Sequence, residues 1–187
     1  MKSSIRTGLC KRILTTDWRR VGRGVVVGSG LLFGFFVVLG LAGVRMNTTP
    51  SLPVGIYLET GPESPLIEFC PSGESAAIAS RRGYRTSGDC PDGASALLKP
   101  IVAKAGDAVE LTAEGIYVNN QLVRNTAPLA VDTDHRPLEH FPFGRYVVAD
   151  EDVWVASSYN KRSFDSRYYG PVSKRAIRAH LRPLLTL

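Results

Sequence analysis

The chain has 187 residues, of which 44% are hydrophobic, and a formal net charge of +6. This length allows one domain with its own core and a small appendage. Residues 1–24 hold seven of the 23 basic residues and one of the 17 acidic residues, so the remainder of the chain is formally neutral. Because a nucleic-acid-binding domain carries positive charge over its folded surface, this distribution argues against a nucleic-acid partner.

Residues 25–44 contain no charged side chain. A helix of that length crosses the ~30 Å hydrocarbon core of a bilayer, so the sequence predicts a transmembrane helix with the lipid bilayer as a partner. The basic residues before it predict that residues 1–24 are a cytoplasmic tail and that residues 45–187 are exported. A cleaved secretory signal is the alternative, but the run exceeds the ~7–15 apolar residues of such signals and Ala42-Gly43-Val44 is a poor cleavage site.

Two of the three cysteines, Cys70 and Cys90, fall in the exported part, where disulfides persist. A bond between them would close a loop of about 20 residues and stabilise the domain by about 3 kcal/mol. Cys10 would remain unpaired in the cytoplasm. The alternative for the exported pair is two free thiols, and a metal site is disfavoured because few Cys and His ligands are present.

The sequence of the exported part indicates many short strands separated by turns, which predicts a mainly β domain. The predicted strands and hairpins span residues 66–70, 96–104, 108–111, 115–123, 145–149 and 153–157. Residues 71–95 and 125–144 are predicted to be loops, because turn-forming residues are frequent in both. Residues 177–187 are predicted to form a short C-terminal helix that is interrupted at Pro183.

Ser51 is the candidate nucleophile. Pro50 and Pro53 restrict the backbone on either side of it, so the segment should be a stiff turn that presents one hydroxyl in a fixed orientation. It is the seventh residue after the apolar run, a distance of at most about 25 Å, which predicts that it is held close to the membrane surface. The alternative is a proline-rich linker that carries an ordinary serine.

Lys99 is the candidate general base. Strand alternation places it on one face between Leu97 and Ile101, and burial between aliphatic side chains lowers the pKa of a lysine. A decrease of about 3 units from ~10.4 would leave a useful fraction of neutral amine at pH 7, which could take the proton of Ser51 as a Ser-Lys dyad. The alternative is a lysine whose stem is buried and whose ammonium reaches water. Lys104 is a second candidate base, which its position at a strand end predicts to be exposed.

The segment from Ser163 to Gly170 is polar and aromatic. Asp165 and Arg167 could form a local ion pair or bind other partners, and the hydroxyl of Ser163 could orient the lysine amine. The alternative is a polar loop with a structural salt bridge.

Three motifs occur in order along the chain. They are Asn47-x-Thr49-x-Ser51-x-Pro53-x-Gly55-x-Tyr57, then Lys99 followed by Gly106-Asp107, and then Ser163-x-Asp165-Ser166-Arg167-Tyr168-x-Gly170. Together they resemble the type I signal peptidase family of membrane serine proteases, and most closely its conjugation branch, the TraF-type plasmid transfer peptidases. The housekeeping enzymes have Met after the serine and Arg after the lysine, whereas this chain has Leu52 and Pro100, which argues against ordinary secretory-signal processing.

The resemblance implies a signal-peptidase-like β domain in which Ser51 is the nucleophile and Lys99 the general base. The supporting positions of the family correspond here to Thr49, Ser163, Asp165 and Arg167. A hydroxyl at the first position would help the backbone N–H of the nucleophile to stabilise the oxyanion, and one at the second would hydrogen-bond the lysine. No cofactor is implied.

The resemblance also implies a substrate and a location. The substrate would be a membrane-embedded pilin precursor, which is trimmed and, in the conjugation branch, can be joined head to tail through the acyl-enzyme. The enzyme would be a single-pass protein of the bacterial inner membrane with a periplasmic catalytic domain, working beside other conjugation machinery.

Three alternatives to this function remain. A general signal peptidase would remove secretory signal peptides. A Ser-His-Asp hydrolase would use one of the three histidines, His135, His140 or His180, none of which lies in a convincing motif. A non-catalytic, membrane-anchored β domain would serve as an assembly scaffold.

Overall fold

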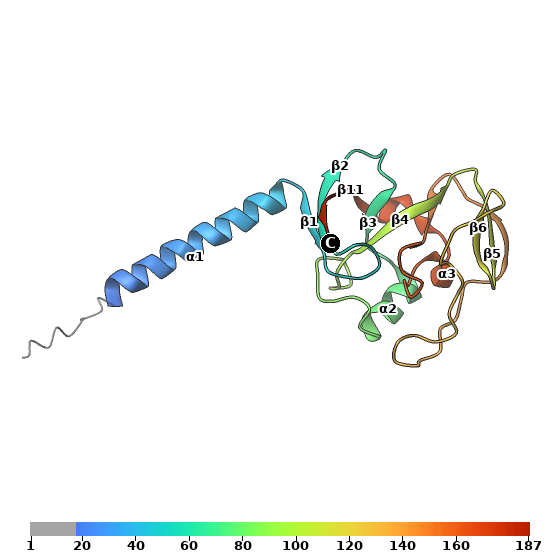
Figure 1. Cartoon of the computed structure of the whole chain (residues 1–187), viewed down its shortest axis with the longest axis horizontal. Helices are drawn as coiled ribbons and strands as arrows, with labels where there is room; N and C mark the ends of the chain where they lie inside the picture. Colours follow the sequence, from blue (N-terminus) through green and yellow to red (C-terminus); the bar gives the residue numbers. More distant parts are fainter. Residues whose placement is uncertain (1–17) are drawn as a thin grey trace, which may run out of the picture. The chain divides into compact units, whose positions relative to one another are not determined.

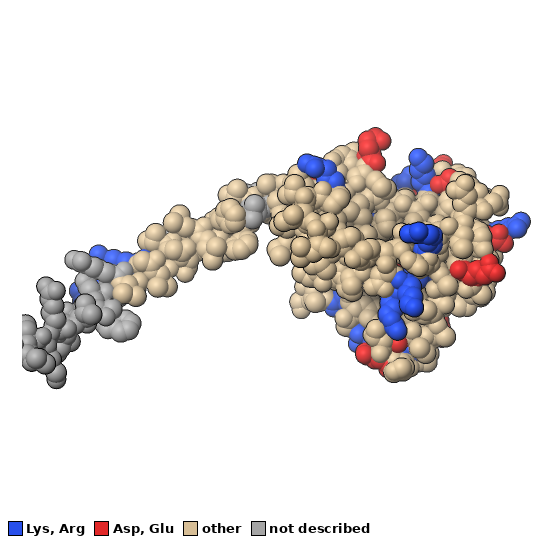
Figure 2. All heavy atoms as spheres, in the orientation of Figure 1, with Lys and Arg blue, Asp and Glu red and all other residues tan. Residues whose placement is uncertain are grey.

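The computed structural model of this chain describes residues 18–187, which divide into a long helix and a domain of residues 42–187 (Figure 1). The helix α1 (Trp18–Leu41) contains an 18-residue stretch, Val21–Val38, that is long and apolar enough to cross a membrane by length and composition. Beyond its first turns the helix carries no Lys, Arg, Asp or Glu, as Figure 2 shows. Cys10 and most of the predicted cytoplasmic tail lie outside the described residues.

The domain consists of two antiparallel sheets. The seven-stranded sheet contains, in spatial order, β1 (Val44–Asn47), β2 (Gly55–Thr60), β11 (Ile177–Thr186), β3 (Leu66–Phe69), β4 (Leu97–Lys104), β9 (Asp152–Val155) and β10 (Val172–Ser173). The four-stranded sheet contains β7 (Gln121–Leu122), β6 (Gly115–Val118), β5 (Ala108–Thr112) and β8 (Gly144–Val147). Figure 1 shows β5 and β6 at the opposite end of the domain from β1 and β2. The prediction of a mainly β domain is confirmed.

The apolar helix is displaced from the predicted range of residues 25–44: it begins at Trp18 and ends at Leu41. It ends early because Gly43 has a left-handed backbone, with φ of 74°, and its carbonyl accepts a hydrogen bond of 2.9 Å from the Glu59 N–H in β2. A Cβ at Gly43 would lie 2.7 Å from the Cβ of Glu59, so only glycine allows this approach. The last apolar residue of the run, Val44, therefore belongs to the sheet.

The predicted C-terminal helix is wrong, because residues 177–186 form β11, which pairs with β2 on one side and β3 on the other. The burial of this segment alternates: Ala179 and Leu181 are buried, whereas Arg178 and Arg182 are exposed, which is the period of a strand. Pro183, which suggested an interrupted helix, lies where the register with β2 shifts, and a proline is tolerated at such an irregularity.

The predicted loop of residues 71–95 contains one helix, α2 (Gly73–Arg81), whose residues Ala76 and Ala79 are buried. A disulfide between Cys70 and Cys90 closes this segment, as the sequence predicted. Two ion pairs lie near the bridge, one between Arg85 and Asp92 and one between Arg178 and Asp89. The disulfide and the pair between Arg178 and Asp89 therefore fix the segment to β3 and β11, whereas the pair between Arg85 and Asp92 lies within the segment.

Core packing connects the strands that carry the predicted site. One cluster of buried residues joins β3, β9 and β10 and contains Ile67, Phe69, Val153, Val155 and Val172. A second joins the two sheets around Trp154, and a third, around Tyr57, joins β2 and β11. On the face shown in Figure 2, basic and acidic side chains are interspersed over the domain, in keeping with its formal neutrality.

Loss of the disulfide should destabilise the domain. The double variant Cys70→Ser/Cys90→Ser frees a loop with a sequence separation of 20, so we expect its free energy of unfolding to fall by about 3 kcal/mol. Urea unfolding of the full chain in detergent, followed by tryptophan fluorescence, measures this change. Reduction of the wild-type protein should produce the same loss and should not affect the double variant; equal stability of oxidised wild type and variant would contradict the prediction.

Candidate active site

Ser51 lies in the turn between β1 and β2, and the side chain of Asn47 holds this turn. Its Nδ2 donates to the carbonyls of Thr49, Leu52 and Pro53 at 3.0, 3.2 and 3.0 Å. Its Oδ1 accepts from the backbone N–H of Thr49 at 3.2 Å. One buried side chain thus replaces the ladder hydrogen bonds that this proline-containing segment lacks.

Lys99 projects from β4, opposite Ile67 in β3, and is 2% exposed. Its Nζ lies 2.5 Å from Ser51 Oγ and 2.8 Å from Ser163 Oγ. Leu97 and Ile101 pack against the same core cluster that contains Ile67, as strand alternation predicted. The structure therefore brings together the serine and the lysine that the sequence selected, although 48 residues separate them.

Burial lowers the pKa of Lys99 to about 8, the carboxylate of Asp165 acts in the opposite direction, and the charge of Arg167 adds to the lowering. With this pKa, roughly a tenth of the amine is neutral at pH 7. Lys99 therefore has both the position and the protonation equilibrium of a general base.

The other candidate bases lie elsewhere. Lys104 is exposed at the end of β4. His140 Nδ1 lies 2.7 Å from the carbonyl of Phe141, and His180 Nδ1 lies 2.8 Å from that of Ser64. His135 is in a surface turn with φ of 60°. In the described part of the chain, none of the three histidines contacts Ser51, which leaves a Ser-His-Asp triad without a base.

Asp165 and Arg167 form an ion pair whose side chains are both 0% exposed. Arg167 Nε donates to Asp165 Oδ1 at 2.8 Å, and Nη2 donates to Oδ2 at 2.9 Å. Asp165 also caps the short helix α3 (Ser166–Tyr169). The buried charges are thus paired in the two-bond geometry that compensates their desolvation best.

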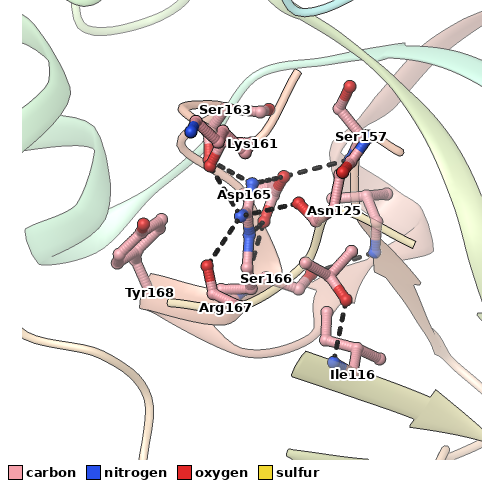
Figure 3. Close-up of polar contacts among 12 residues, drawn as sticks. Ile116, Asn125, Ser157, Lys161, Ser163, Asp165, Ser166, Arg167 and Tyr168 are labelled. Carbon is pink, nitrogen blue, oxygen red and sulfur yellow. Dashed lines mark hydrogen bonds and ion pairs between the residues drawn. The ribbon is translucent and has the colours of Figure 1, made fainter. Parts of the chain in front are cut away.

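The remaining N–H groups of Arg167 bind backbone carbonyls, which Figure 3 shows converging on the guanidinium. These carbonyls belong to Asn125, Ala127, Lys161 and Ser163. Because Ser163 contacts Lys99 Nζ, Arg167 fixes the backbone of a residue that touches the lysine. Asp165 and Arg167 therefore support the site without contacting the reacting atoms.

Two further side chains bind the backbone around Ser51, and the sequence did not indicate them. Ser157 Oγ donates to the carbonyl of Ser51 at 2.5 Å, and Asn160 Nδ2 donates to the carbonyl of Pro50 at 3.0 Å. Their partners are 106 and 110 residues away along the chain, so no local spacing could have revealed them. The only sequence signal was their position immediately before the motif that begins at Ser163.

Thr49 lies two residues before the nucleophile, but its hydroxyl donates to Asn47 Oδ1 at 2.9 Å. A hydroxyl has one proton, so Thr49 must rotate away from Asn47 before it can donate to an oxyanion. The backbone N–H of Ser51 makes no hydrogen bond to residues 18–187. The N–H of the nucleophile is therefore the donor that this conformation leaves available.

A cavity of about 350 Å³ opens beside Ser51 and Lys99. Its apolar lining includes Leu97, Leu129, Val131, Leu138, Phe164 and Tyr168. A larger cavity of about 670 Å³ shares three of these residues and continues between α2 and residues 137–142. Ser51 and Lys99 thus line an apolar cavity that adjoins a larger, more polar one, and the two together have room for several residues of an extended polypeptide.

One wall of the smaller cavity depends on Asp132, whose carboxylate accepts from the Tyr84 hydroxyl at 2.5 Å and from Arg136 Nε at 2.6 Å. Tyr84 belongs to the segment closed by the disulfide. It lines the cavity together with Asp132 and the neighbours of Asp132, Val131 and Thr133. Burial raises the pKa of Asp132, but these hydrogen bonds outweigh it and hold the pKa well below its ordinary value. The wall therefore stays intact over the neutral and mildly acidic range.

A hydroxyl beside a buried amine, with a free backbone donor and an apolar cavity, is an arrangement suited to acyl transfer from a peptide substrate. Among residues 18–187, no group of three or more His, Cys, Asp and Glu side chains is placed to hold a metal ion. The chain belongs to the signal peptidase family, peptidase S26, whose sequence profile matches residues 25–184. The resemblance inferred from the motifs is confirmed, and the protein is a peptidase of this family.

The most similar relatives include proteins of plasmid transfer. A plasmid transfer protein TraF of Escherichia coli is 32% identical over 173 residues, which cover 90% of this chain and 98% of the relative. A probable conjugal transfer protein TraF of Sinorhizobium fredii is 31% identical over 181 residues, covering 91% of this chain and 94% of the relative. A crystal structure of a signal peptidase I from Enterococcus faecalis is 16% identical, with a TM-score of 0.35 over 66% of this chain and 99% of that one.

Neutralising one member of the buried ion pair should destabilise the domain. In Asp165→Asn the shape is kept but the charge of Arg167 is uncompensated, so we expect a loss of about 3–5 kcal/mol in the free energy of unfolding. Asp89→Asn is the matched control, because its pair with Arg178 is 73% and 37% exposed and should contribute about 1 kcal/mol or less. Equal, small losses in both variants, measured by urea unfolding, would show that the buried pair does not stabilise the domain.

Proposed function

We propose that this protein is a membrane-anchored serine endopeptidase that cleaves a membrane pilin precursor during conjugative plasmid transfer, with Ser51 as nucleophile and Lys99 as general base. The observation that carries the proposal is the distance of 2.5 Å between Lys99 Nζ and Ser51 Oγ, on a lysine that is 2% exposed. A solvated lysine with a pKa of ~10.4 would be almost entirely protonated at pH 7 and could not accept the serine proton. In a non-catalytic scaffold, the burial of an amine against a hydroxyl would cost stability without a compensating function.

The reaction would proceed in two acyl-transfer steps. Neutral Lys99 accepts the hydroxyl proton while Ser51 Oγ attacks the carbonyl carbon of the scissile bond, and the oxyanion forms near the Ser51 N–H. The lysine, now an ammonium, keeps its contact with Ser163 Oγ at 2.8 Å and gives the proton to the leaving amine, which departs as the C–N bond breaks. The acyl-enzyme remains on Ser51.

The second step decides the product. Attack by water on the acyl-enzyme, with proton transfer through Lys99, releases a trimmed linear chain. Attack by the amino terminus of the same substrate chain forms a new peptide bond and releases a head-to-tail ring. The site requires the same base for both, since each attacking group must lose a proton to become bonded to the carbonyl carbon.

Three observations support a membrane-embedded pilin precursor as substrate. The relatives from Escherichia coli and Sinorhizobium fredii are named for plasmid and conjugal transfer. The length and composition of α1 suit a bilayer anchor, and the basic residues before it favour a periplasmic domain on the bacterial inner membrane. The two adjoining cavities suit an extended polypeptide next to Ser51.

Removal of either member of the dyad should abolish processing. We expect Ser51→Ala and Lys99→Met to leave a pilin precursor uncut when the full-length enzyme and the precursor are reconstituted in the same vesicles and followed by intact mass. A ring weighs one water less than the trimmed linear chain, so the same spectrum identifies the product. Lys104→Met is the matched control, since this exposed lysine should leave processing unchanged. Substantial cleavage by either dyad variant would contradict the mechanism, and cleavage of secretory precursors instead of pilin would reassign the substrate.

The reaction should also depend on pH through Lys99. Because burial lowers the pKa of Lys99 to about 8, the neutral fraction falls about tenfold for each pH unit below 8. We therefore expect kcat/KM to rise with pH, to level off above pH 8, and to be roughly 1% of the plateau at pH 6. Circular dichroism at each pH controls for unfolding. A constant kcat/KM between pH 5 and pH 8 would exclude an amine base.

A further inference from the structure

Two hydrogen bonds hold the peptide groups on both sides of Ser51. The peptide group before it, which joins Pro50 to Ser51, is held at the Pro50 carbonyl by Asn160 Nδ2 at 3.0 Å. The peptide group after it is held at the Ser51 carbonyl by Ser157 Oγ at 2.5 Å. Both donors belong to one four-residue segment, 157–160. This segment therefore restrains the rotation of both peptide planes that flank the nucleophile.

The bond from Asn160 also determines where the Ser51 N–H points. The described chain contains no cis peptide bonds, and in a trans peptide the carbonyl and the N–H point in opposite directions. The Pro50 carbonyl points toward Asn160, so the Ser51 N–H points away from segment 157–160. This N–H binds no group within residues 18–187, so it is free to donate to a substrate oxygen.

The segment itself is anchored in the protein interior. Ser157 is 0% exposed, and its N–H donates to Asp165 Oδ2 at 3.0 Å. Its Oγ also accepts from the backbone N–H groups of Tyr159 and Asn160, at 3.2 and 3.1 Å, which forms a tight turn. The Asn160 carbonyl accepts from the Ser163 N–H at 3.0 Å. The buried Asp165–Arg167 pair is thereby linked to the backbone of Ser51 through Ser157.

We infer that Asn160 and Ser157 are positioning residues that aim the backbone N–H of Ser51 at the oxyanion of the tetrahedral intermediate. This inference rests on the proposed Ser51 nucleophile and adds a role for segment 157–160 in transition-state stabilisation. Asp165 would then support Ser51 through Ser157, in addition to any effect through the contact between Ser163 and Lys99. Neither positioning residue hydrogen-bonds to Ser51 Oγ or to Lys99 Nζ; their bonds go to the backbone carbonyls on either side of Ser51.

The test uses an isosteric change. Asn160→Asp keeps Oδ1 as the acceptor of the Arg162 N–H, at 2.9 Å, but replaces the donor to Pro50 by a carboxylate oxygen that repels the carbonyl. Asn119→Asp is the matched control: Asn119 Oδ1 also accepts a backbone N–H and its Nδ2 also donates, but in the β6–β7 hairpin. The probe is p-nitrophenyl acetate, and the readout is the rate at which Ser51 of the full-length enzyme gains one acetyl group by mass.

We expect Asn160→Asp to lower the limiting acetylation rate by about tenfold or more, since a lost oxyanion donor reduces kcat by about 10²–10³. The KM for the ester and the melting temperature should stay unchanged, whereas a structural defect would alter them. The rates are compared on the pH plateau, because a carboxylate at residue 160 lines the same cavity as Lys99 and raises the pKa of the lysine. Asn160→Gln, which retains the amide donor, should recover part of the rate. Asn119→Asp should acetylate at the wild-type rate.

Ser157→Ala provides a second variant, with Ser64→Ala as its control. Ser64 Oγ likewise donates to a carbonyl at 2.5 Å, that of Leu181, and accepts a backbone N–H, but between β2 and β3. A slower acetylation in Ser157→Ala alone supports the inference. Wild-type rates in both Asn160→Asp and Ser157→Ala would overturn it while leaving the dyad intact. An unmodified Ser51 in the wild-type enzyme would overturn the nucleophile itself, and with it both proposals.

Discussion

The burial of Lys99 is the constraint on which the rest of the site depends. A change of its pKa from 10.5 to about 8 corresponds to about 3 kcal/mol of lost stabilisation of the ammonium. That is a large fraction of the ~5–15 kcal/mol net free energy of unfolding of a domain, so the packing of the surrounding strands must offset the cost of burying the amine. Lys99 is 2% exposed, and its strand neighbours Leu97 and Ile101 pack against the core cluster that contains Ile67.

The same requirement explains why a carboxylate lies near the lysine but does not bind it. A direct ion pair between Asp165 and Lys99 would raise the lysine pKa and keep the amine protonated. Arg167 prevents this, because it takes both oxygens of the carboxylate and adds its own opposing charge. The partners left to Lys99 are two hydroxyls, those of Ser51 and Ser163, which can bind either protonation state.

Sequence patterns predicted the parts of this arrangement that are local. Alternation around Lys99 placed it between two aliphatic neighbours, and the spacing of Asp165 and Arg167 allowed an ion pair; both features are present. Ser157 and Asn160 could not be predicted, since each is a common residue whose role comes from a partner over 100 residues away. The boundaries of α1 were missed because apolarity predicts the span suited to a bilayer, whereas backbone geometry at Gly43 decides where the helix stops.

The most consequential error concerned residues 177–187, and the observed strand reveals how Ser51 and Lys99 come into contact. Ser51 follows β1 and Lys99 lies in β4, but β2 and β3 do not pair with each other. β11 lies between them and hydrogen-bonds to both, so this strand joins the hairpin that carries Ser51 to β3, which in turn pairs with β4, the strand that carries Lys99. Helix propensity is a local property and gave no indication of this pairing. The approach of Ser51 to Lys99 thus depends on a strand that contains neither residue. A change that removes the pairing of β11 with either neighbour would therefore separate Ser51 from Lys99 without altering either residue.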